Sequence, residues 1–145
     1  MAIVIVMERN LWHQLNQIQK HKQNYKSWKL TRIETSTING VPDVHCLISG
    51  FSFWLELKAN EDKNYGLSKY QIIWQLDYIA RKGFVYNLVF APSQRMLKLV
   101  AINPASFSFN HTDKTHKSGF VVLDTVKYTQ DNLCKIIKSI LIRNS

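Results

Sequence analysis

Residues 41–59, VPDVHCLISGFSFWLELKA, contain two extended runs that meet at Ser49-Gly50. A serine and a glycine between alternating apolar residues are typical of a two-residue β-hairpin turn. This turn predicts that Ile48 pairs with Phe51, and the same register pairs position 46 with 53 and position 44 with 55, which are all apolar. One face of the hairpin is therefore expected to join the core.

The opposite face of the hairpin carries two carboxylates and a lysine. Asp43 and Glu56 are expected directly opposite each other, with Lys58 two residues further along the same face. Facing carboxylates repel, so a cation between them would explain the pair. Mg²⁺ takes such oxygen ligands, and an adjacent lysine can orient water or neutralise charge on a phosphate. The triplet predicts a phosphodiester hydrolase, and its alternative is an ordinary solvated strand face.

The rest of the sequence predicts an α/β fold. Helical spacing of apolar residues predicts helices over 8–25, 68–83 and from 129 onward. Further strands are expected over 30–37, 84–91, 96–102 and 120–128. The residues before Met7 are read either as a loose strand or as an upstream initiation tail. This order predicts one domain over 1–145, a central mixed sheet flanked by helices, with 103–145 as its C-terminal extension.

Composition narrows the kind of partner. Lys and Arg number 19 against 10 Asp and Glu, a formal charge of +9 in 145 residues, which points to a polyanion such as DNA or RNA. Cys46 and Cys134 form no CxxC pair, so buried thiols in a reducing compartment are expected. No run approaches the ~20 apolar residues of a membrane span. The expected location is the cytoplasm, or the host cytoplasm if a phage encodes the chain.

The motif and its surroundings resemble a nuclease superfamily. Val41-Pro42-Asp43, followed after twelve residues by Glu56-Leu57-Lys58, resembles the PD-(D/E)XK pattern. GVPDVHCLISGFSFWLELKAN and GLSKYQIIWQLDYIARKGF together resemble its virus-type replication-repair nuclease (VRR-NUC) branch, and more distantly the Holliday junction resolvases, over about residues 8–100. The resemblance implies a restriction-endonuclease-like domain and a Mg²⁺-dependent endonuclease acting in DNA repair or recombination.

The resemblance also implies roles for individual residues. Asp43 and Glu56 would hold Mg²⁺ or Mn²⁺, with the main-chain carbonyl of Leu57 as a further ligand, and Lys58 would be the catalytic lysine. Gln71 matches the helix glutamine that approaches the metal centre in this family. The spacing of Ser68 and Gln71 is equally that of a helix capping box, and both interpretations can hold.

One more acidic residue is expected near the metal. Glu8 lies three, four and seven residues before apolar positions of the first helix, which places it on the inward stripe. Glu34 is the alternative. If residues 39–40 form a tight turn, Ser36 falls beside Asp43, and the side chains of both Arg32 and Glu34 lie on the catalytic face.

Three cations are the predicted DNA contacts. Arg32 is read as a phosphate clamp, with an ion pair to Glu34 as its alternative, and Lys63 and Lys69 flank the expected site. On the second helix, a stripe containing Trp74 and Tyr78 suggests base stacking or, preferably, a homodimer interface, since two symmetric sites cut two strands. The expected substrate is branched or flapped DNA. The alternatives left open are a non-catalytic DNA-binding subunit, a restriction-type nuclease on linear duplex and a nuclease acting on RNA.

Overall fold

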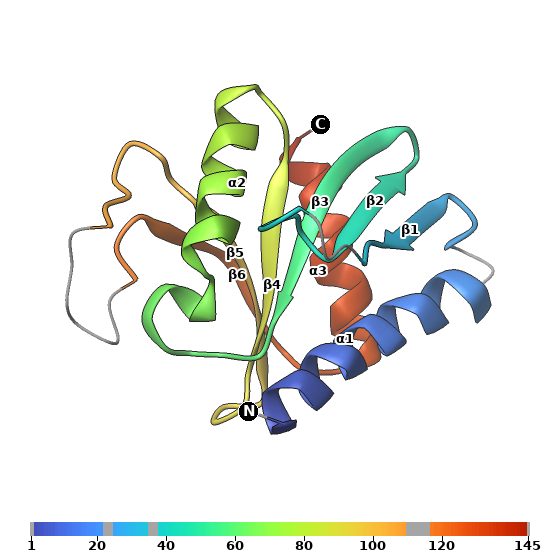
Figure 1. Ribbon diagram of the computed structural model, residues 1–145. Helices are drawn as coiled ribbons and strands as arrows, with labels where there is room; N and C mark the ends of the chain where they lie inside the picture. Colours follow the sequence, from blue (N-terminus) through green and yellow to red (C-terminus); the bar gives the residue numbers. More distant parts are fainter. Residues whose placement is uncertain (1, 22–24, 35–37, 110–116, 145) are drawn as a thin grey trace.

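The computed structural model describes residues 2–21, 25–34, 38–109 and 117–144, without the side chains of residues 2–6. Within these residues a six-stranded sheet runs in the order β1-β2-β3-β4-β5-β6 (Figure 1). Its strands are β1 (Trp28–Arg32), β2 (Val44–Ile48), β3 (Phe51–Lys58), β4 (Val85–Ala91), β5 (Met96–Ile102) and β6 (Phe120–Lys127). The helices are α1 (Ala2–His21), α2 (Lys69–Ala80) and α3 (Gln130–Arg143), with a short 3₁₀ turn η2 (Lys63–Gly66).

The sheet is mixed, as predicted. Strands β3 and β4 run parallel, because the connection between them crosses one face of the sheet as η2 and α2, and the other neighbouring strands are antiparallel. Helices α1 and α3 cover the opposite face (Figure 1). The chain therefore folds as a three-layer α/β domain.

The main core lies between the sheet and the pair α1 and α3. Leu11, Leu15 and Ile18 on α1 are fully buried at helical spacing, against the apolar faces of β2 to β5. Ile136 and Ile140 on α3 join the same core. Strand β6 and α3 thus belong to the one sheet and the one core, although residues 103–145 lie beyond the family resemblance.

The register predicted for the hairpin is confirmed, and the register predicted for the first strand is wrong. Ile48 pairs with Phe51 as the Ser49-Gly50 turn predicts. Residues 39–40 do not form a two-residue hairpin turn, because Arg32 pairs with Val44 and the strand β1 ends there. Ser36 lies outside the described residues. The observed pairing of β1 with β2 is shifted by an odd number of residues from the predicted pairing. Such a shift turns the side chains of β1 to the opposite face of the sheet.

Both ends of the first helix also differ from the prediction. Helix α1 begins at Ala2 rather than Glu8 and ends at His21 rather than Tyr25. Residues 2–6 therefore continue the helix instead of forming a loose strand or a separate tail. Both cysteines are buried free thiols, as predicted. None of the helices in the described ranges is long and apolar enough to cross a membrane.

Candidate active site

Asp43 lies where strands β2 and β3 part. The ladder between them starts at Val44, one residue later, while β3 continues to Lys58. The backbone carbonyl of Asp43 accepts a hydrogen bond from the Ile33 N–H at 2.7 Å. Its side-chain Oδ2 accepts the Leu57 N–H at 2.9 Å. The carboxylate is thus held against β3 although it lies outside the strands.

The loop before Asp43 is fixed from the other side by α2. At Gly40 the backbone has φ +87°, and a Cβ there would come within 2.3 Å of the Tyr70 carbonyl oxygen. Only glycine combines that conformation with so close an approach. Residue 40 therefore serves to seat this loop on the first turn of α2, which explains why the Asn39-Gly40 pair is not a hairpin turn.

Glu56 is the most unusual side chain of the cluster. It is 1% exposed, and no described residue offers a hydrogen-bond partner to its Oε2. Burial, a hydrogen bond shared with Asp43 and the charge of Asp43 raise the pKa of Glu56 to about 10, and Lys58 only partly opposes them. A carboxyl group kept neutral at pH 7 in this way costs stability, so its retention calls for a function.

Glu8 joins this cluster and Glu34 does not. Burial raises the pKa of Glu8, the charges of Lys58 and Arg32 lower it, and the charge of Asp43 raises it. These couplings place the Glu8 carboxylate within electrostatic reach of the other site residues. The side chain of Glu34 is 83% exposed and forms an ion pair with Arg32 at 3.5 Å. The inward position predicted for Glu8 is therefore the one that approaches the site.

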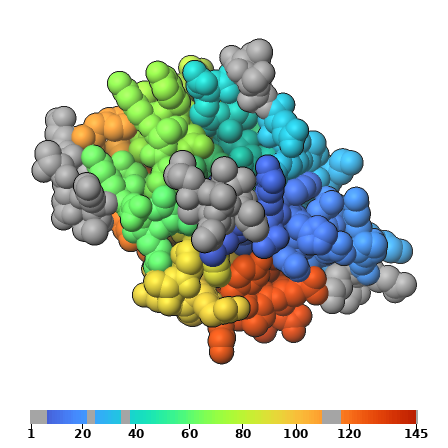
Figure 2. Space-filling view, turned by 60° about the horizontal axis from the view of Figure 1, so that its bottom comes forward, coloured from blue at the N-terminus to red at the C-terminus, as the bar shows by residue number. Residues whose placement is uncertain are grey.

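A hollow of about 190 Å³ opens at this cluster, lined by Glu8, Arg9, Arg32, Asp43 and Leu57. Figure 2 faces the end of the molecule where α1 (blue), the segment after β3 (green) and the turn between β4 and β5 (yellow) meet. Arg9 was not predicted from the sequence. No local signal was available, because adjacent residues of a helix do not share a face and Arg9 is exposed. A further hollow of about 600 Å³ adjoins, because Arg32 and Asp43 line both.

The residues present fit a divalent cation. The buried Oε2 of Glu56 has no hydrogen-bond partner within the described part of the chain, and Asp43 supplies a second carboxylate beside it. In the described ranges no three His, Cys, Asp or Glu side chains converge as a complete ligand cluster. Mg²⁺ needs only one or two carboxylates, since water and phosphate oxygens complete its shell. The Leu57 carbonyl remains a predicted ligand.

The two glutamine side chains of α2 make different contacts. Gln71 closes the capping box, accepting the Ser68 N–H through Oε1 at 2.8 Å. Gln75, which sequence reasoning missed, is fully buried and exchanges two hydrogen bonds with Asn87, at 2.7 and 3.0 Å. Asn87 is the register partner of Glu56. The amide pair therefore ties α2 to β4 directly beside the buried carboxyl.

Removing one member of this amide pair is expected to be costly. Gln75→Leu leaves the Asn87 amide without its main partner and should lower the free energy of unfolding by about 1–3 kcal/mol. The double variant Gln75→Leu with Asn87→Leu should recover part of that loss, because neither amide is then left without the other. Urea unfolding measures both, and a single variant as stable as the wild type would contradict the assignment.

The predicted DNA contacts fall into two groups. Arg32 lines the hollow at the carboxylates, with its guanidinium 5.9 Å from the Trp12 ring centre. Lys63 and Lys69 line a different hollow, at the start of α2. The ring of Trp74 packs edge-on against Trp54 at 5.4 Å and stacks on another ring of α2, so this part of the predicted stripe is used within the chain.

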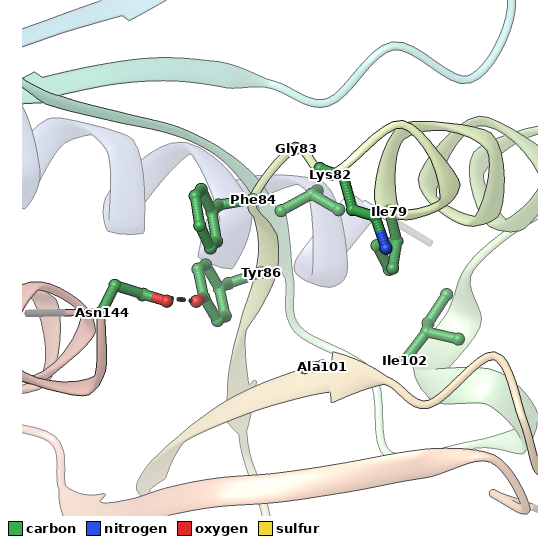
Figure 3. Close-up of a pocket in the computed structure, with 9 residues that line it drawn as sticks. Ile79, Lys82, Gly83, Phe84, Tyr86, Ala101, Ile102 and Asn144 are labelled. Carbon is green, nitrogen blue, oxygen red and sulfur yellow. Dashed lines mark hydrogen bonds between the residues drawn. The ribbon is translucent and has the colours of Figure 1, made fainter.

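A further hollow, of about 400 Å³, lies at the opposite end of β4 (Figure 3). Ile79, Phe84 and Ile102 contribute apolar walls, and Asn144 donates a hydrogen bond to the Tyr86 hydroxyl at 2.8 Å. None of the described residues that line this hollow carries a carboxylate. The chemistry of the described chain therefore concentrates at the Asp43 and Glu56 end.

No family model matches this sequence, and a search of curated proteins finds no match either. The arrangement of residues must therefore carry the functional argument.

Proposed function

We propose that this protein is a metal-dependent endodeoxyribonuclease that hydrolyses phosphodiester bonds. The observation that carries the proposal is the buried Glu56 oxygen, which no described residue partners, next to Asp43 and two residues from Lys58. An acid buried at such cost beside a second acid is what a divalent-cation site requires. The net charge of +9 adds the attraction for a polyanion.

Each residue of the cluster has a part in this reaction. Asp43 and Glu56 would hold Mg²⁺ or Mn²⁺, which when bound makes phosphorus more electrophilic and water more acidic. Lys58 places its ammonium beside them, where it orients water and balances the negative charge that grows on the phosphate oxygens. Arg9 and Arg32 line the adjoining hollow and would grip the phosphate backbone there.

The substrate proposed is branched or flapped DNA, as for a Holliday junction resolvase. Arg32 and Asp43 line both the hollow at the carboxylates and the larger neighbouring one, and we propose that a DNA strand crosses the site along these two hollows. Cutting both arms of a junction symmetrically calls for two copies, and the homodimer remains a prediction. Equal cutting of linear duplex would instead indicate a restriction-type nuclease.

Cleavage with and without metal tests the proposal. Wild-type protein should cut a four-way junction or a flap in Mg²⁺ and not in EDTA. Loss of a group outside a metal's ligand shell costs about 10- to 100-fold in activity. Asp43→Asn should reduce cutting by more than that, because Asp43 is a proposed ligand. The matched control is Asp77→Asn, an exposed carboxylate on α2 that pairs with Arg81. A chain that binds DNA and cuts none of these substrates would be a binding subunit, which overturns the proposal.

A further inference from the structure

We propose that the hollow at the start of α2 binds one unpaired nucleotide of the substrate strand, an inference that rests on the nuclease function proposed above. The hollow measures about 430 Å³, and its lining consists of Lys63, Asn64, Leu67, Lys69, Ile72 and Phe109. Small-molecule sites in proteins usually measure about 300–1,000 Å³. Its walls combine two cations, one amide and an apolar floor with an aromatic ring, which are the groups that a phosphate and a base require.

The hollow lies close to the catalytic end of β3. Tyr65 of η2 packs against Val89 in a small separate core. Val89 is the register partner of Lys58. The turn that forms one wall of the hollow therefore packs on β4, the strand paired with β3 at the proposed catalytic lysine.

The backbone of this wall has an unusual conformation. Asn64, Tyr65 and Gly66 are consecutive left-handed residues, with φ of +54°, +52° and +75°. A Cβ on Gly66 would meet the Asn60 side-chain nitrogen at 2.8 Å. Strained conformations of this kind persist where the surroundings hold them and are concentrated at functional sites. Here the strained turn brings the amide of Asn64 into the wall of the hollow.

The side-chain oxygen of Asn64 is the recognition group of the proposed site. The residue is 8% exposed, and its Oδ1 is buried without a hydrogen-bond partner among the described residues. Every base carries at least one N–H donor on its Watson–Crick edge, and these edges are free only in an unpaired nucleotide. A base entering the hollow would satisfy this oxygen, whereas a base in a duplex would not.

The other lining residues complete the match. Phe109 is 46% exposed, and Phe107 supports its ring edge-on at 5.0 Å, which leaves a face for stacking. Lys69 opens α2, where the positive end of the helix dipole adds to its charge, and Lys63 lines the same hollow. These cations suit the phosphate that accompanies the base.

Binding in EDTA separates this inference from catalysis. Fluorescence anisotropy would follow a labelled single-stranded oligonucleotide and the matching blunt duplex. Phe109→Ala and Asn64→Gly, which keeps a residue tolerant of positive φ, should each weaken single-strand binding about tenfold and duplex binding much less. Phe109→Tyr retains a ring and should bind as the wild type does. Lys69→Gln should weaken binding more than the control Lys135→Gln, a lysine exposed on α3 at the other face of the sheet.

Each outcome decides a separate point. Equal affinity of Phe109→Ala, Asn64→Gly and wild-type protein for the single strand would overturn the nucleotide site, even if metal-dependent cleavage is found. Losses that are the same for single strand and duplex would also overturn it, because they would report general charge and not an unpaired base. Selective single-strand losses in a protein that cuts no DNA would support the site and reject the nuclease.

Discussion

Glu56→Gln is expected to stabilise the metal-free protein by about 3 kcal/mol at pH 7. The pKa of Glu56 is raised to about 10 in the folded chain, against 4.5 for an ordinary glutamate. At pH 7 folding must therefore return a proton to this group, which costs about 1.36 kcal/mol for each pH unit above 4.5. Glutamine keeps the volume of the side chain and carries no proton to lose.

The sign of the pH dependence follows from the raised pKa. Below about pH 4.5 Glu56 is neutral in both the folded and unfolded chain, and the two proteins should differ little. As the pH rises towards about 10 the unfolded state gains stability from ionisation, so the wild type becomes steadily less stable while the Gln variant lacks this slope. The advantage of the variant therefore grows between pH 5 and pH 8.

Thermal unfolding in EDTA checks this result. At pH 7 the melting temperature of Glu56→Gln should rise by roughly 5–10 °C. The matched control is Glu34→Gln, whose carboxylate is 83% exposed and whose replacement should leave the melting temperature almost unchanged. Added Mg²⁺ should stabilise the wild type by mass action and leave the variant unaffected. A Glu56→Gln variant that is less stable than the wild type at pH 7 would refute the assignment of Glu56 as a buried neutral acid.

The same replacement should remove cleavage. A gain in stability together with a loss of activity is what a residue retained for function predicts, because its burial serves the reaction and not the fold. A residue retained for packing alone would show the reverse. The pair of measurements therefore separates the functional explanation of Glu56 from a structural one.

The sequence was sufficient to predict the parts of the site that depend on local signals, such as a turn or helical spacing. The Ser49-Gly50 turn and the alternation around it placed the carboxylates of Asp43 and Glu56 at one point, because a hairpin register is set by its own turn. Glu8 was correctly placed on an inward stripe because helical spacing decides which side chains a helix buries. These predictions needed only neighbours in sequence.

Local signals did not predict contacts between residues that are far apart in the sequence. The register of β1 depends on where the chain returns to the sheet at Asp43 and Val44. Gly40 packs against the first turn of α2, and no local sequence pattern reveals that contact. The pairing of Gln75 was not predicted, because its partner Asn87 lies twelve residues away on β4. An asparagine inside the apolar run VYNLVF, with a glutamine at the inward helical spacing, was the signal available.

Lys58→Met is expected to lower kcat by about 10²- to 10³-fold, the usual loss when one group that stabilises transition-state charge is removed. Lys58 is half-buried at the end of β3, and its charge acts on both Glu8 and Glu56. Methionine keeps the length of the side chain without the ammonium. Because Glu56 is neutral at pH 7 in the metal-free protein, the free energy of unfolding should change by less than about 1 kcal/mol.

The matched control for this variant is Lys29→Met. Lys29 is also a strand lysine, exposed on β1 opposite Leu47 at the other end of the hairpin, so its replacement removes the same charge away from the carboxylates. It should weaken DNA binding slightly and leave kcat unchanged. Lys58→Arg restores the charge in a planar group that cannot give up a proton at neutral pH. Full recovery of kcat in Lys58→Arg would assign Lys58 to charge stabilisation, and partial recovery would assign it to the orientation or deprotonation of water. Equal kcat values for Lys58→Met and Lys29→Met would show that Lys58 takes no part in the reaction.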